Sequence, residues 1–318
     1  IIPEAITLKD FKLSFPKSTK PLLQNPGFKV ENSTITLDAK NNVGINANIS
    51  MFETLLKING VIDPKEINLV AIDSKINMNA FGPISGVKIN GSGPIEVKVS
   101  GPYDDVRFDF EANWKKFSLI DLNFGDVKAA FSLSLADVIL SIEKLEGKFN
   151  QSQFDATGWL KFGDASGLDL KLNFPNTNFA DARNMYGLVF NGLKLPPDLA
   201  LKFETQYRVF GSFDLADLKI DGKVKGRELK AYGEDFESVT FSMGLNNKNL
   251  SFTNLKLKKG RGDIQGSANI SLANNYAEVE ASGVGIRLSD LNFYKKFGFA
   301  YDSDLSLEYD GNGTSDNY

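Results

Sequence analysis

The sequence predicts an all-β protein with a few short helices, on three observations. Apolar and polar residues alternate with a period of two through most of the chain, as in strands that cover only one face. Phenylalanine is abundant at 25 residues, beside 28 glycines and only 11 prolines, a composition typical of strands and turns. Helical periodicity is rare and brief.

The alternating segments predict strands that are apolar on one face and polar on the other. Ser, Asn, Asp, Lys or Glu separates the apolar residues, so one sheet face meets water and the other must meet something apolar. The clearest of these segments are residues 11–15, 35–39, 45–49, 106–110, 131–135, 168–174 and 305–309.

Two helices are predicted. One begins with a cap at Ser289 and continues through Phe293 and Phe297, which are one turn apart, with two lysines near its end and Gly298 beyond it. The segment 178–189 is the predicted counterpart. Neither helix indicates a function.

The composition excludes most enzyme machinery. The chain has no histidine and no cysteine, so it lacks an imidazole base, a catalytic thiol, disulfides and the usual ligands of zinc and iron–sulfur clusters. We therefore predict no catalytic residue, no metal and no cofactor. With 36 basic and 40 acidic residues, the chain has no basic field that would favour a nucleic acid partner. Carboxylate neighbours such as Glu234 and Asp235 are interpreted as solvated turns.

The chain also repeats itself at an interval of 110 residues. Residues 99–104 (VSGPYD) recur as 209–214 (VFGSFD), and residues 131–135 (FSLSL) recur as 241–245 (FSMGL). The predicted helices correspond in the same way. A stack of similar units, each touching its neighbours, is the expected architecture.

Three repeat units are predicted from this spacing. Residues 99–208 and 209–318 are two copies of one module, and residues 1–98 are a divergent third copy, because Gly60–Pro64 echoes the shared turn. We expect the three units to form one continuous β-groove, and we expect the sequence to be an excerpt of a longer chain.

Long one-sided strands, Gly-x-Φ-Asp turns and segments such as Phe154–Leu160 (FDATGWL) and Gly262–Ala268 (GDIQGSA) resemble the AsmA-like and TamB-type envelope proteins. The resemblance implies an elongated, twisted, mostly antiparallel sheet that curls into a U-shaped open groove. It also implies a non-enzymatic conduit in the periplasm, along which phospholipids move between the inner and outer membranes. An inner-membrane anchor and an outer-membrane partner would then lie in parts outside this sequence.

A conduit for acyl chains needs a continuous apolar lining, which strands with Phe, Leu and Ile on one face can supply. For each candidate residue, ordinary core packing is the alternative. The candidate lining residues are Phe108, Phe110, Phe131, Leu133, Leu135, Leu140, Ile142, Leu170, Leu172, Phe203, Ile220, Phe241, Met243, Leu245, Leu250, Phe252, Ile264 and Ile270.

Other protein classes fit the same alternation of apolar and polar residues. A structural or adhesive array of β-sandwiches is the main alternative, because two one-sided sheets that face each other give the same alternation. An outer-membrane barrel and an enzyme are weaker alternatives. Leu133 can distinguish a groove from a sandwich, because its face of the strand is open in a groove and sealed in a sandwich. Its neighbours Ser132 and Ser134 are expected to face water on the opposite side of the strand.

Overall fold

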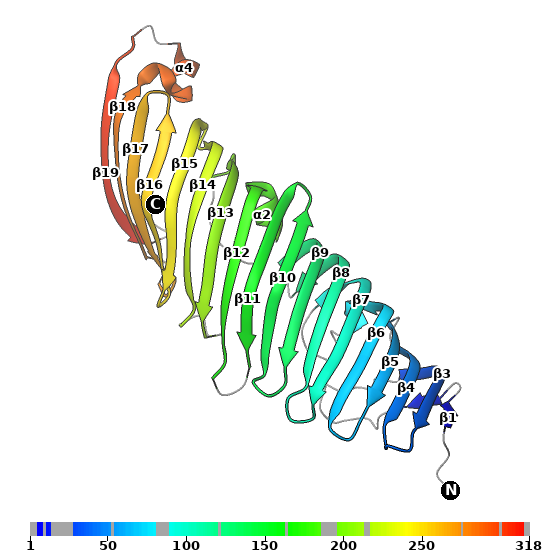
Figure 1. Cartoon of the computed structure of the whole chain (residues 1–318). Coiled ribbons are helices and arrows are strands. Elements are labelled where there is room, and N and C mark those ends of the chain that lie inside the picture. Colours follow the sequence, from blue (N-terminus) through cyan, green and yellow to red (C-terminus); the bar gives the residue numbers. More distant parts are fainter. Residues whose placement is uncertain are drawn as a thin grey trace. The chain divides into compact units, whose positions relative to one another are not determined.

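The computed structural model confirms the predicted fold class, an all-β protein built from an open antiparallel sheet with few and short helices (Figure 1). It describes residues 5–8, 11–13, 28–51, 54–80, 89–119, 122–162, 165–185, 196–212, 217–274, 276–298 and 301–314.

Contacts within the chain define two units, which are described separately. Unit 1 comprises Ile1–Phe149, Trp159–Asp164 and Met185–Leu188, and unit 2 comprises Asn150–Gly158, Ala165–Asn184 and Val189–Tyr318. The boundary between the units falls within β11 (Ser152–Lys161). The three predicted repeat units have other boundaries and stay a prediction.

In unit 1, β1 and β2 both pair with β3, and from β3 to β10 each strand pairs antiparallel with the next one along the chain. The strands are β1 (Ala5–Leu8), β2 (Phe11–Leu13), β3 (Phe28–Leu37), β4 (Val43–Met51), β5 (Thr54–Ile62), β6 (Glu66–Asn77), β7 (Ile89–Pro102), β8 (Arg107–Leu119), β9 (Leu122–Ser134) and β10 (Ile139–Phe149). A short 3₁₀ helix, η2 (Met78–Ala80), follows β6.

Unit 2 has the same simple connectivity, in which each strand from β12 to β19 pairs antiparallel with its successor. The strands are β12 (Gly167–Asn178), β13 (Ala200–Gly211), β14 (Lys219–Ala231), β15 (Glu234–Asn246), β16 (Asn249–Lys259), β17 (Gly262–Ser271), β18 (Tyr276–Arg287) and β19 (Asp304–Thr314). The short helices are α2 (Phe179–Met185), η3 (Leu288–Asp290) and α4 (Asn292–Phe297).

Regular β-bulges interrupt the ladders of both units. An extra residue in one strand of a pair bends that strand and increases its twist, which is how open sheets acquire curvature. Most of the extra residues are exposed, and several of them, such as Asp73, Lys116 and Asn254, have positive φ. The register shifts lie within 31–34, 71–74, 114–117, 123–125, 142–144, 174–177, 227–230, 252–255 and 283–286.

The bulges follow a rule that periodicity alone does not reveal. In unit 1 they fall in β3, β6, β8, β9 and β10, and in unit 2 they fall in β12, β14, β16 and β18. From β6 onward, therefore, the even-numbered strands of each unit each carry one extra residue, and β9 is the one odd-numbered strand in this range of the described registers that does so as well. Bending is built into the sheets at least at every second strand.

The predicted C-terminal helix is right at its end and wrong at its start. Gly298 closes α4 in the left-handed region, with φ of 65°, a conformation that glycine adopts without a Cβ penalty. Ser289 does not cap α4, because it lies in η3 and its hydroxyl donates to Asp302 at 2.9 Å. Leu291 occupies the N-cap position and provides no side-chain cap.

The predicted counterpart over 178–189 is helical from Phe179 over its described part. Helix α2 spans Phe179–Met185, and residues 186–189 lie outside the described part of the chain. Asn178 is its N-cap, since its side-chain oxygen accepts the Asp181 N–H at 2.8 Å.

Strand bounds recur at the interval that the sequence repeat predicts. Strands β16 and β17 begin and end 110 residues after β10 and β11, respectively. A polar contact also recurs earlier in the chain: the Asn178 N–H donates to Ser152 Oγ at 3.3 Å, and the Asn77 N–H donates to Thr54 Oγ1 at 3.0 Å. In both places the first residue of one strand binds the last residue of the next. The relation of residues 1–98 to the other repeats stays a prediction.

Candidate functional site

The pairing registers bring the predicted lining residues onto one face of each sheet, here called the apolar face. In unit 2 the registers align a single row across six consecutive strands, β12 to β17. That row is Leu170, Val209, Ile220, Leu245, Leu250 and Ile270. The neighbouring row is Leu172, Tyr207, Gly222, Met243, Phe252 and Ala268.

Further rows of unit 2 include the remaining candidates. Phe241 faces Val224 in β14 and its ring meets that of Phe252 edge-on, with centroids 5.7 Å apart. Phe203 in β13 pairs with Gly226, and the same row across the strands continues through Val239 and Leu257 to Ile264. All the candidates of unit 2 therefore lie on the same side of the sheet.

Unit 1 has an apolar face of the same kind. One row aligns Val99, Phe108, Leu133 and Leu140, and the next aligns Val97, Phe110, Phe131 and Ile142. The rings of Phe108 and Phe110 are stacked with centroids 6.1 Å apart. Leu135 follows the end of β9, where its N–H donates to the Val106 carbonyl at 3.1 Å.

The apolar face is partly open to solvent. Of the candidates, Ile142 and Leu245 are buried, Leu135 is 50% exposed, and the others are half-buried. In each unit the extensive strand contacts join only sheet neighbours, so among the described residues no second sheet packs against this face. That arrangement contradicts a sandwich within the described part of either unit.

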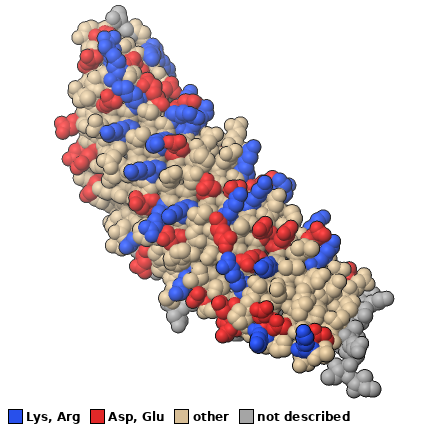
Figure 2. All heavy atoms as spheres, in the orientation of Figure 1, with Lys and Arg blue, Asp and Glu red and all other residues tan. Residues whose placement is uncertain are grey.

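The opposite face, here called the polar face, carries ion pairs between and along strands. In unit 1, Arg107 lies 2.7 Å from Asp109 and 3.1 Å from Glu143. In unit 2, Arg208 lies 2.7 Å from Asp169, and this contact lowers the pKa of that carboxyl. Figure 2 shows one face of the molecule, over which basic and acidic side chains of both units are interspersed. Such exposed pairs contribute little stability but keep this face wet.

Ser132 departs from the expectation of a solvated serine. It does lie on the polar face, opposite Asp109 and Ser141, but its exposed fraction is only 6%. The expectation that Ser132 faces open water is therefore wrong, because flanking strands with Arg107 and Glu143 cover it. Ala130, on the same face of β9, is half-exposed.

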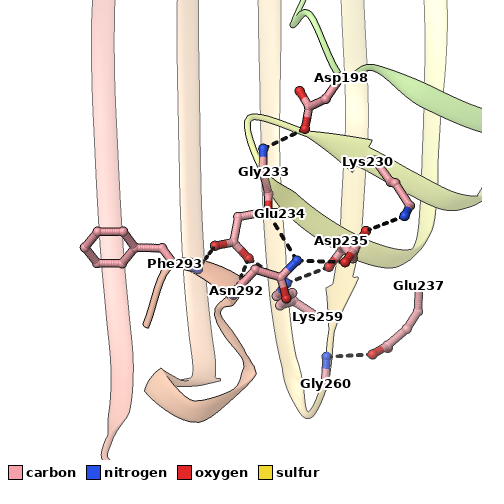
Figure 3. A network of polar contacts seen from close by, with 10 residues as sticks. All are labelled: Asp198, Lys230, Gly233, Glu234, Asp235, Glu237, Lys259, Gly260, Asn292 and Phe293. Atoms are coloured by element: carbon pink, nitrogen blue, oxygen red, sulfur yellow. Dashed lines mark hydrogen bonds and ion pairs between the residues drawn. The ribbon is translucent and has the colours of Figure 1, made fainter. Parts of the chain in front are cut away.

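A polar network lies on the apolar face of unit 2 at the end of β16 (Figure 3). Lys259, the last residue of β16, lies on the same face of that strand as Leu255 and Leu257 and is only 3% exposed. Its ammonium lies 2.7 Å from the Glu234 carboxylate and donates to the Asp235 carbonyl at 2.7 Å. The buried cation is thus paired and hydrogen-bonded, as burial requires.

Glu234 also holds helix α4. Its two carboxylate oxygens accept the backbone N–H groups of Asn292 and Phe293, each at 2.9 Å. Burial alone would raise the pKa of Glu234, but the hydrogen bonds from Lys259, Phe293 and Asn292 outweigh it and lower the pKa. This carboxylate, from a different strand, does the work that a side-chain N-cap would otherwise do.

The sequence interpretation missed this network. Glu234 and Asp235 were interpreted as a solvated turn, whereas Glu234 is half-buried and ion-paired. A signal was available, because alternation through Leu255 and Leu257 places Lys259 on the apolar face, where a lysine needs a partner.

A hollow of about 720 Å³ lies beside the network. Cationic and anionic side chains line it in equal number, so it offers no net charge to a ligand. The charged lining residues are Arg227, Lys230, Lys259, Lys295, Glu228, Asp235, Glu237 and Asp290.

Comparisons with known proteins give no assignment: no protein-family model, no curated protein and no solved structure matches the chain significantly. Within the described ranges, no His, Cys, Asp and Glu residues gather in a way that could hold a metal ion. None of the described helices is long and apolar enough to cross a bilayer. The apolar face is therefore the feature on which a function must be argued.

Proposed function

We propose that the protein is a non-enzymatic lipid carrier whose apolar face accommodates the acyl chains of phospholipids. The observation that supports this most directly is an apolar face that is continuous over several strands, while no described element covers it. On the resemblance to AsmA-like and TamB-type proteins, we propose that this activity takes place in the periplasm, between the inner and outer membranes.

The energetics favour such a surface for this cargo. An acyl chain of about sixteen carbons loses roughly 0.8 kcal/mol per methylene, or about 12 kcal/mol in all, when it leaves a bilayer for water. Rows of Leu, Ile and Phe replace the lost apolar contacts at each step along the sheet. No basic cluster accompanies these rows, and we therefore expect contact with acyl chains to dominate and headgroup selectivity to be weak.

The first test is to look for bound lipid. Protein purified without detergent is extracted with organic solvent, and the extract is analysed by mass spectrometry. We expect several phospholipid molecules per chain with mixed headgroups. Extracts free of lipid, together with no labelling by a photo-crosslinkable acyl probe, would refute the proposal.

The second test is a charge placed on each face of β9. Leu133→Arg puts a guanidinium on the apolar face, where it can reach solvent past the half-exposed rows, so the protein should fold but lose lipid. Ala130→Arg is the matched control on the polar face, opposite Glu111, and should retain both fold and lipid. Ser132 is unsuitable as a control because it is buried.

The outcomes of this pair are distinct. Circular dichroism reports folding and mass spectrometry reports lipid. If Leu133→Arg aggregates while Ala130→Arg is silent, Leu133 belongs to a sealed core and does not contact lipid. If Leu133→Arg folds and binds lipid like the unmodified chain, the apolar face of unit 1 is not the binding surface.

A further inference from the structure

The most exposed large apolar side chains of the described residues gather around helix α4. Tyr232 is 78% exposed, Tyr301 73%, Phe293 62% and Phe297 59%, and only Val284 lies within the same range. A helix that served only to cover a core would bury its aromatic residues, because each ring removes a large apolar area from water when buried.

Two contacts place the chain segments that carry these aromatic residues beside η3 and α4, and we call the group the aromatic tip. The side chain of Asn292 donates to the Gly233 carbonyl at 3.1 Å, which places Tyr232 and Phe293 each one residue away from the same hydrogen bond. Asp302, which follows Tyr301, accepts the Ser289 hydroxyl at 2.9 Å. The aromatic tip consists of Tyr232, Phe293, Phe297 and Tyr301.

The aromatic tip is held in place rather than loosely attached. The Glu234 carboxylate binds both the Asn292 and Phe293 N–H groups, and Asn292 also donates to the Asp235 carboxylate at 2.7 Å. Figure 3 shows the Phe293 ring directed away from this network. The rings of Phe293 and Phe297 meet edge-on with centroids 5.0 Å apart, so they present one paired apolar surface.

Two cations accompany the rings. Lys295 and Lys296 are exposed in the last turn of α4, and no carboxylate of the described residues lies within ion-pair distance of either. Lys295 shares the hollow beside the network with Asp235, Glu237 and Asp290, but it forms no direct ion pair with them. The ammonium groups of both lysines therefore stay exposed next to the rings and can contact a phosphate.

We propose that the aromatic tip docks onto the interfacial region of a lipid bilayer, with the Phe293 and Phe297 rings inserted among the headgroups and Lys295 and Lys296 contacting phosphate. Phe, Tyr and Lys together match this region, because aromatic rings partition to the headgroup level and cations are attracted to anionic lipid. A protein partner is less favoured, since protein interfaces are depleted in lysine at their cores.

Docking at the aromatic tip goes beyond carriage of lipid on the apolar face and does not require it. A protein stripped of lipid would still present the rings and the lysines. If both activities exist, the tip would set where the apolar face exchanges lipid with a membrane. The two properties can therefore fail separately in experiments.

The test is flotation of the purified 318-residue chain with vesicles. We compare vesicles of pure phosphatidylcholine with vesicles that contain about 30% phosphatidylglycerol, expecting stronger binding to the anionic vesicles because of the two lysines. The double variant Phe293→Ala, Phe297→Ala should weaken partitioning at least about tenfold on both kinds of vesicle. It should still carry co-purified lipid if the apolar face does so.

Val284→Ala is the matched control, because Val284 is 61% exposed, lies on the polar face of β18 and is not part of the aromatic tip. It should bind vesicles like the unmodified chain. A single probe, Phe297→Trp, should shift its emission to shorter wavelength when anionic vesicles are added, whereas Val284→Trp should not.

The proposal is overturned if the unmodified chain floats with neither vesicle, if the double alanine variant binds as well as the unmodified chain, or if the Phe297→Trp emission does not change. If the double variant instead abolishes self-association in light scattering while vesicles never bind, the aromatic tip is a contact between copies of this chain. Loss of co-purified lipid in the double variant without loss of flotation would likewise contradict it.

Discussion

Two corners of unit 2, equivalent in the 110-residue repeat, fix a short helix beside the sheet by different chemistry. In the first, here the Asp181 corner, the Asp181 carboxylate from α2 reaches back to the turn after β10. It accepts hydrogen bonds from Asn150 Nδ2 at 2.9 Å, Ser152 Oγ at 2.8 Å and Asn178 Nδ2 at 2.9 Å. All the donors at this corner are neutral.

In the second, here the Glu234 corner, the carboxylate comes from the sheet and the helix supplies the donors. Asp290, the positional equivalent of Asp181, is only half-buried and lies against Gly260, the equivalent of Asn150. Glu234 takes over the anchoring role, with Lys259 as its ionic partner.

The comparison teaches that the repeat preserves the location of the helix rather than the residues that hold it. A helix anchored by its own aspartate must turn that side inward, whereas a helix anchored by its backbone N–H groups does not need a side chain of its own for the anchor. The Glu234 corner thereby exposes Phe293 and Phe297, while Phe179 at the start of α2 is half-buried.

The largest effect is expected from breaking the Glu234 corner. Glu234→Ala leaves Lys259, whose side chain is 4% exposed, without its ionic partner, and this should cost about 3 kcal/mol in the free energy of unfolding. Urea denaturation measures the cost. Lys258→Met is the control, because it removes an exposed pair with Asp263 and should cost less than about 1 kcal/mol. Equal costs for the two variants would show that the pair does not hold this corner.

A smaller effect is expected from Asp181→Asn, about 1–3 kcal/mol at neutral pH, because the amide presents an N–H group to donors that need an acceptor. Burial raises the pKa of Asp181, but the hydrogen bonds from Asn150, Ser152, Gln151 and Asn178 outweigh it and lower the pKa. The carboxylate therefore stabilises the folded state above the unfolded-state pKa of about 3.9, and this contribution disappears as pH falls through the folded value.

Urea denaturation at several pH values checks the sign of this effect. The difference in the free energy of unfolding between the unmodified chain and Asp181→Asn should be largest at pH 7 and should become smaller below about pH 4. Asp155→Asn, which changes a single half-buried contact with Asn173, should cost less than about 1 kcal/mol. A gap that widens on acidification would contradict the assigned role of Asp181.

The smallest effect is expected from replacing Gly260, the turn residue of the Glu234 corner, by alanine or by the asparagine found at the Asp181 corner. Gly260 has φ of 56° and Asn150 has φ of 51°, so both occupy the left-handed region. Gly260→Ala should cost about 1 kcal/mol, since alanine disfavours this conformation and its Cβ would meet the Asp290 carboxylate. Gly260→Asn should cost less, because asparagine tolerates the conformation. Thermal unfolding distinguishes the two variants, and equal changes in melting temperature would mean that the positive φ of residue 260 does not determine the cost.

Much of the fold follows from the sequence because strand alternation is local. The period of two places Leu170, Ile220 and Leu250 on one face before any pairing is known, and the registers then align them in one row. The interval of 110 residues likewise predicts the bounds of β16 and β17 from those of β10 and β11.

What the sequence did not predict depends on contacts distant in the chain. The partner of Lys259 lies 25 residues away in another strand, and the donors to Glu234 lie 58 and 59 residues away. Periodicity carries no information about such pairs. The start of α4 was missed for the same reason, since its anchor is Glu234 rather than the adjacent Ser289.

The simple strand order within each unit has a consequence for how the chain folds. From β3 to β10 and from β12 to β19 every pairing joins consecutive strands, so each can form as a hairpin without waiting for a distant segment. Loop-closure entropy stays low, and such a sheet should fold faster than sandwiches of similar length. Below the global transition, opening should also begin locally, with amide hydrogens at β19 exchanging before those at β15.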